Sequence, residues 1–126
     1  MSGRGVVLDA GAFIALERRS EKMVALARRF AQAKTPLVTS AGVVAQIWRG
    51  GGHHQVPVSF LLARTEVVDL TAQVARTLGL MLATARATDA IDAHVALLAR
   101  ERGWPVLTSD PGDLHAIDGS LVIEKI

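Results

Sequence analysis

The stretch "GVVLDAGAFIALERR" (5–19) decides the fold, because it joins a buried strand to a helix through a single acid. "GVVLD" (5–9) is a short apolar run ending in Asp9, which is typical of a strand covered on both faces. "AGAFIALERR" (10–19) predicts a short helix directly after it. A buried strand that leads into a helix is the repeating unit of a parallel sheet.

The same alternation of strands and helices continues to the end of the chain. We expect further strands at 35–40, 66–70, 105–109 and 121–125. We expect helices after Ser20, over 41–49 with Ser40 as N-cap, from Thr71 to about Ala85, from Thr88 onward and within 110–117, and a loop with a short helix over 53–65. The pattern predicts a single α/β domain over 1–126, a sandwich in which a small, mostly parallel, twisted sheet has helices on both faces.

Composition excludes several classes of protein. Of the 126 residues, 50% are hydrophobic and 21% are charged, as expected of a globular chain. There is no cysteine, which rules out disulfides and thiolate chemistry. The start of the chain does not resemble a signal peptide, and no apolar run approaches the ~20 residues that cross a bilayer. We therefore expect a cytoplasmic protein with no membrane partner.

Charge is distributed unevenly between the two halves. Residues 1–64 carry nine Lys and Arg and three acids, whereas 65–126 carry five basic and nine acidic residues. A basic half suggests a polyanionic partner, and an acidic half suggests a cation site. The basic run at 18–34 is equally consistent with a solvated helix face.

Five aspartates stand at predicted junctions between strands and helices: Asp9, Asp89, Asp92, Asp110 and Asp113. Taken singly, each fits a structural role at a helix start, where a carboxylate caps amide groups and meets the positive end of the helix dipole. We expect Thr88 to cap the helix that contains Asp89 and Asp92, and Asp110 to cap the one that begins with proline.

Taken together, the aspartates suggest a site. The carboxyl ends of parallel strands lie along one edge of a sheet, so acids from distant parts of the sequence can converge there. Converging carboxylates raise one another's pKa unless a cation neutralises them. Oxygen ligands without cysteine suit Mg²⁺ or Mn²⁺, and such ions can activate water against a phosphodiester.

Three stretches resemble the motifs of PIN-domain ribonucleases, in particular bacterial VapC-type toxins: "VVLDAGAFIAL" (6–16), "DAIDAHVALLA" (89–99) and "VLTSDPGDL" (106–114). The resemblance spans nearly the whole chain. It implies an endoribonuclease that depends on Mg²⁺ or Mn²⁺ and acts as the toxin of a toxin–antitoxin pair. It further implies a homodimer that cleaves RNA and is held inactive by a cognate antitoxin protein.

The motifs assign roles to particular residues. The resemblance implies that Asp9, Asp92 and Asp110 are metal ligands and catalytic, with Asp113 also catalytic and with Asp89 and Thr108 in support. Arg18, Arg19 and Arg49 are the basic residues that we expect to bind the RNA backbone.

Two positions depart from the family pattern. Gln46 stands where the family has a glutamate, and its amide can orient a cation or water but supplies neither charge nor a base. Gly11 and Ala12 have no hydroxyl or amide, although the family often has Ser, Thr or Asn near Asp9. An alternative function is therefore a degenerate, non-catalytic PIN domain that binds RNA or a protein partner.

Other readings receive less support from the residues. A phosphatase or phosphoacceptor domain also has acids at strand ends, but "LDAGA" (8–12) lacks the second acid of a DxD motif. The four histidines have no zinc-site spacing, and we expect them at the surface. Trp48 is expected to pack in the core or at a dimer interface.

Overall fold

The computed structural model describes residues 4–126. The first three residues of the predicted domain lie outside this part. The sheet contains β1 (Val6–Leu8), β2 (Leu37–Ser40), β3 (Thr65–Val68), β4 (Val106–Thr108) and β5 (Ile123–Lys125). Its strand order is β3-β2-β1-β4-β5, and every neighbouring pair is parallel.

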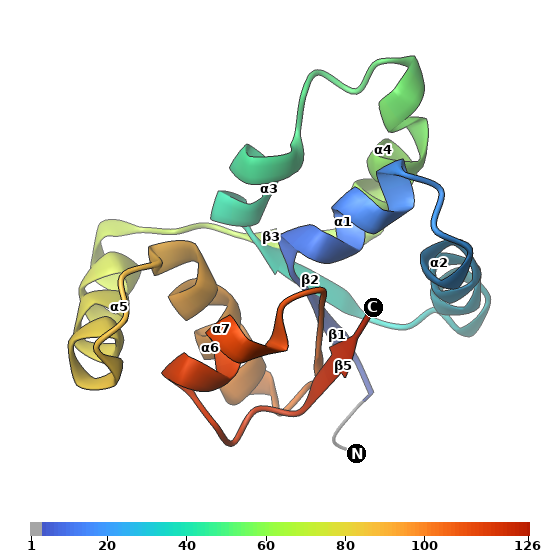
Figure 1. Cartoon of the computed structure of the whole chain (residues 1–126). Helices are drawn as coiled ribbons and strands as arrows, with labels where there is room; N and C mark the ends of the chain where they lie inside the picture. Colours follow the sequence, from blue (N-terminus) through green and yellow to red (C-terminus); the bar gives the residue numbers. More distant parts are fainter. Residues whose placement is uncertain (1–3) are drawn as a thin grey trace.

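Helices cover both faces of this sheet (Figure 1). Their bounds are α1 (Ala10–Glu17), α2 (Glu21–Ala33), α3 (Ala41–Ile47), α4 (Val56–Ala63), α5 (Ala72–Ala85), α6 (Ala90–Arg102) and α7 (Pro111–Ile117), with a 3₁₀ turn at His53–Gln55. Helix α1 packs with α2, α3 and α4, whereas α6 packs across β1, β2 and β4 together with α5 and α7. The predicted α/β sandwich is confirmed. None of the helices described is long and apolar enough to cross a membrane.

The core lies between the central strands and the two helical layers. Val7, Val38 and Val106 in the three inner strands are completely buried. Phe13 of α1 covers one face of the sheet, and Leu98 of α6 belongs to the same core. Each such buried side chain stabilises the fold by about 1.5–3 kcal/mol. Apolar burial is therefore the main force that holds the helices against the sheet.

Hydroxyl side chains start three of the helices as predicted. Ser20, Ser40 and Thr71 accept hydrogen bonds from backbone amides two or three residues further on. The expected Thr88 cap is wrong, because the N-cap of α6 is Asp89. A carboxylate one residue later reaches two amides of the first turn instead of one.

Helix α3 ends two residues earlier than predicted because a buried amide holds the chain beyond it. Gln55 is completely buried, and its Oε1 accepts hydrogen bonds from the backbone amides of Arg49 and Gly51. Its Nε2 donates to the carbonyl oxygen of Ile47. These bonds close the glycine-rich loop against the end of the helix, so the chain turns at Trp48.

Parallel pairing brings distant parts of the sequence to one edge. β1 and β4 are neighbours in the same direction, so Asp9 and the segment after Thr108 leave the sheet together. α6 begins at this edge as well, since its first turn contacts the first turn of α3 through Gly42 and Ile91. The strand ends therefore place the acidic motifs side by side.

Candidate active site

Asp9 is the buried centre of the site. Its side chain is 8% exposed and follows β1 as the N-cap of α1, as predicted. The Ala10 amide donates to its Oδ1 at 2.8 Å, and the Thr108 hydroxyl donates to its Oδ2 at 2.8 Å. These two bonds fix the orientation of the carboxylate.

Thr108 connects Asp9 to the next acid. It is completely buried at the end of β4, and its Oγ1 also accepts a hydrogen bond from the Asp110 amide at 3.0 Å. One hydroxyl therefore ties the carboxylate after β1 to the backbone after β4. The resemblance gives Thr108 a supporting role, and in the structure its hydroxyl contacts the Asp9 carboxylate.

Asp89 and Asp92 enter from the start of α6. The Oδ1 of Asp89 accepts hydrogen bonds from the amides of Ile91 and Asp92, each at 2.9 Å. Asp92 lies one turn further and is partly buried. Together with Asp113, both line a pocket of about 290 Å³ between α6 and α7.

Asp92 is the most strongly perturbed acid of the group. Burial, followed by the nearby charges of Asp89, Asp9, Asp113 and Asp110, raises the pKa of Asp92 from 3.8 to about 7. Burial and like charge both disfavour the ionised form. The other four predicted acids therefore all lie near enough to Asp92 to act on its carboxyl group electrostatically.

Asp110 and Asp113 interact with each other instead of capping α7. Asp110 occupies the N-cap position but makes no side-chain cap, so the predicted cap is wrong. A side-chain hydrogen bond with Asp110, followed by its negative charge, raises the pKa of Asp113. The like charge of a neighbouring carboxylate disfavours the ionised form of Asp113.

No basic side chain offsets this negative charge within residues 4–126. The ion pairs there join Arg100 to Asp118, Arg102 to Glu66 and, if His54 is protonated, His54 to Glu17. In the same part of the chain, no three His, Cys, Asp or Glu side chains are grouped tightly enough to form a ready-made metal site. The donor set consists of oxygens that suit a hard cation, and the carboxylates would have to move closer together to coordinate one ion.

Gln46 lies on α3 with its side chain exposed. The first turn of α3 contacts the first turn of α6, where Gly42 packs against Ile91. Gln46 is one turn further along α3 and brings no charge toward the acids.

The three predicted RNA-binding arginines lie in two places. Arg18 ends α1 and Arg19 follows it, both exposed at the opposite end of that helix from Asp9, roughly 12 Å along its axis. Arg49 is exposed just after α3, where its guanidinium donates to the carbonyl oxygen of Trp48 at 2.7 Å. Trp48 itself is 39% exposed.

His94 differs from the expectation that all histidines are at the surface. It is 1% exposed, and its Nδ1 lies 2.6 Å from the Ser40 hydroxyl oxygen at the end of β2. Burial lowers the pKa of His94, which favours the neutral ring. The apolar residues around it in α6 were the signal for an inward-facing position. The contact between His94 and Ser40 therefore joins α6 to the end of β2.

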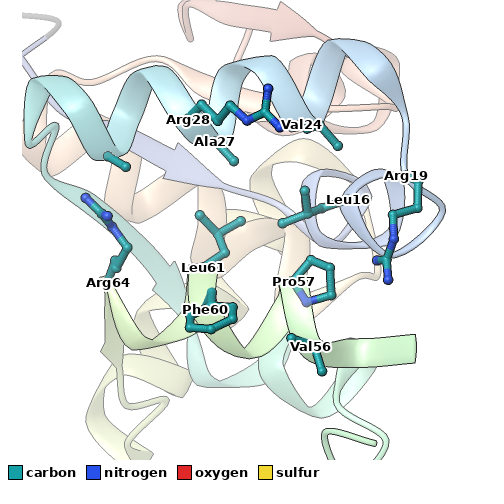
Figure 2. A pocket seen from close by; sticks show the side chains of 11 residues that line it. Leu16, Arg19, Val24, Ala27, Arg28, Val56, Pro57, Phe60, Leu61 and Arg64 are labelled. Atoms are coloured by element: carbon teal, nitrogen blue, oxygen red, sulfur yellow. The ribbon is translucent and has the colours of Figure 1, made fainter. Parts of the chain in front are cut away.

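A second surface feature was not predicted from the sequence. An apolar groove of about 540 Å³ lies between α1, α2 and α4 (Figure 2). Phe60, 70% exposed, and Leu61 line it from α4, and Leu16 lines it from α1. Three exposed arginines also line it: Arg19, Arg28 and Arg64. No ion pair within the described residues involves any of these three.

The structure is a parallel α/β domain with aspartates gathered at the carboxyl ends of its strands. The sequence profile of the PIN domain matches residues 6–119, so the chain belongs to the PIN domain family. PIN domains are generally nucleases. No curated protein matches the chain at a significant level.

Solved structures show the same fold. VapBC2 from Rickettsia felis, bound to a DNA fragment from its promoter, is similar with a TM-score of 0.71 and 15% identity over 96% of this chain and 98% of that one. PAE2754 from Pyrobaculum aerophilum is similar with a TM-score of 0.67 and 15% identity over 94% of this chain and 83% of that one. FitAB bound to the IR36 DNA fragment is similar with a TM-score of 0.63 and 20% identity over 95% of this chain and 94% of that one.

Proposed function

We propose that this PIN domain is a metal-dependent endoribonuclease that hydrolyses RNA phosphodiester bonds and serves as the toxin of a toxin–antitoxin pair. One observation carries the proposal: Asp92 lies partly buried among four other aspartates, with no basic side chain of the described residues paired to any of them. Because the carboxylates in such a site repel one another, binding of a divalent cation there is favoured.

Asp9, Asp92 and Asp110 are the proposed ligands for Mg²⁺ or Mn²⁺. The hydrogen bonds from Thr108 and the Ala10 amide support this proposal, because they hold the Asp9 carboxylate in one orientation. When bound, the ion would lower the pKa of a water molecule and neutralise charge on the scissile phosphate. Asp113 is the proposed proton carrier, because its pKa is raised, and Asp89 is proposed to hold water at the rim of the pocket.

Gln46 is proposed to orient a ligand or water through its amide. Because it brings no charge, the ion is held by fewer negative groups than a glutamate at this position would allow. We propose Arg49, which follows the same helix, as a contact for the RNA backbone. Arg18 and Arg19 would meet only a substrate long enough to cross α1.

The groove between α1, α2 and α4 is the proposed docking surface for the antitoxin. Its apolar lining fits the apolar stripe of an amphipathic segment, and Arg19, Arg28 and Arg64 fit acidic residues beside that stripe. The solved structures of VapBC2 and FitAB support a protein partner for this fold. The proposal also includes a homodimer, which sedimentation of the purified chain would test.

Cleavage of RNA by the purified chain tests the enzyme proposal directly. The protein freed from antitoxin should cut structured cellular RNA with Mg²⁺ or Mn²⁺ but not with EDTA, and Asp9→Asn should abolish cutting. Asp118→Asn is a matched control, because Asp118 pairs with Arg100 away from the five acids. Cleavage that persists in Asp9→Asn would indicate a contaminating nuclease.

The alternative is a degenerate PIN domain that binds RNA or protein without cutting, and Gln46 is the observation that favours it. Titration with Mn²⁺ separates the two proposals. A degenerate site would bind the ion weakly or not at all, and RNA binding would then be unchanged by EDTA.

A further inference from the structure

Gly11 and Ser109 are in unusually close contact at the edge of the acidic site. Gly11 lies in the first turn of α1, two residues after Asp9, and Ser109 lies between Thr108 and Asp110. A Cβ atom added at Gly11 would overlap the Ser109 hydroxyl oxygen and lie 2.9 Å from both the Cβ and the backbone nitrogen of Ser109. The helix and the turn therefore approach more closely than any other residue at position 11 would allow.

Backbone conformation does not explain why position 11 is a glycine. The glycines with positive φ in the described residues are Gly50, Gly51 and Gly103, so Gly11 has a conformation open to any residue. Glycine within a helix costs up to about 1 kcal/mol relative to alanine. The space taken by Ser109 is what requires a residue without a side chain.

The contact joins the two segments that carry proposed metal ligands. Asp9 is fixed at the start of α1, and the Asp110 amide is bonded to Thr108 beside Ser109. A side chain at position 11 would have to push the turn of residues 109–110 away from α1. Mg²⁺ demands oxygen ligands at about 2.0–2.1 Å, so a shift of a few tenths of an ångström weakens its binding.

We propose that Gly11 and Ser109 are a positioning pair whose contact sets the separation of the Asp9 and Asp110 carboxylates. The inference rests on the proposed function in so far as it concerns the ion. It gives the glycine at position 11 a role of its own: the missing side chain leaves room for the Asp110 turn to close onto α1.

Four variants test the pair: Gly11→Ala, Ser109→Gly, the double variant, and Gly79→Ala as a control. Gly79 lies in α5 with open space where its Cβ would be. Mn²⁺ affinity should fall roughly tenfold or more in Gly11→Ala, a loss typical of changes around metal ligands. The double variant should bind Mn²⁺ more tightly than Gly11→Ala but less tightly than the parent, because Ser109→Gly removes the contacts to the Ser109 side chain and leaves the one to its backbone nitrogen. Gly79→Ala should bind Mn²⁺ as the parent does.

Wild-type affinity in Gly11→Ala, or a double variant no better than Gly11→Ala, would overturn the proposal. Crystal structures of the metal-free parent and Gly11→Ala give a readout that needs no ion. The Asp9–Asp110 separation should be larger in the variant, and an unchanged separation would also overturn the inference. If the parent itself binds no Mn²⁺, the proposed metal-dependent function fails, and the two separations still decide the role of the pair.

Discussion

The Thr108 hydroxyl donates a 2.8 Å hydrogen bond to the Asp9 carboxylate across 99 positions of sequence. Both side chains are buried at the carboxyl edge of neighbouring strands. The bond fixes one acid of the proposed site while the same oxygen accepts the Asp110 amide. The orientation of the site is thus decided by a residue with no charge of its own.

Thr108→Val should destabilise the protein by about 1–3 kcal/mol, because a buried carboxylate loses one of its donors without a change in side-chain shape. The free energy of unfolding in urea measures this loss. Thr108→Ser is the control, since it keeps the hydroxyl and removes only a methyl group. Equal stability of Thr108→Val and the parent would contradict the assigned bond.

Asp92→Asn should stabilise the metal-free protein above about pH 5. The pKa of Asp92 is about 7 in the folded chain and 3.8 without its surroundings, so the folded state binds the proton more tightly. Stability of the parent therefore falls as pH rises from about 4 to about 7, by on the order of 1–2 kcal/mol after allowance for solvent screening.

Thermal unfolding in EDTA across this pH range measures the effect. The curve of Asp92→Asn should be flatter than that of the parent, and Mg²⁺ should restore the stability of the parent near pH 8. Parallel curves for the two proteins would show that the Asp92 carboxyl is not perturbed.

Gln46→Glu should raise Mn²⁺ affinity and the rate of RNA cleavage, because in the proposed function it supplies the charged oxygen that Gln46 lacks. We expect a gain of roughly tenfold, the size of effect that a group close to a metal exerts. Calorimetric titration and single-turnover cleavage measure the two quantities. Gln46→Ala is the matched control, and a gain in that variant would mean that the amide obstructs the site.

Phe60→Asp should abolish binding of the antitoxin while leaving RNA cleavage intact. Phe60 is 70% exposed in the groove, so its loss costs little stability, whereas a carboxylate would enter an apolar docking surface. Co-purification with the antitoxin gene product and cleavage by the free protein measure the two outcomes. Leu80→Asp is the control, since Leu80 is 73% exposed on α5. Loss of antitoxin binding in Leu80→Asp alone would mean that the antitoxin binds the helical layer that contains α5.

Gly11 and His94 show which features could not be predicted from residues close in the chain. The absence of a hydroxyl at position 11 is visible in the sequence, but the turn that occupies this space lies in a distant part of the chain, at Ser109. His94 has the properties of a surface residue by type, yet the apolar face of α6 turns it against Ser40. The apolar neighbours of His94 indicate that it faces inward, but long-range packing decided its contact with Ser40 and the closeness of Ser109 to Gly11.

The sequence by itself determined the alternation of buried strands and helices, the edge at which the aspartates gather and most of the helix starts. Each of these depends on apolar periodicity or on hydrogen bonds between residues close in the chain. Only the tertiary structure decided that His94 contacts Ser40, that the turn at Ser109 closes onto Gly11, and that α1, α2 and α4 leave an apolar groove. These features depend on how packed elements meet, because burial and like charge act through space and not along the chain.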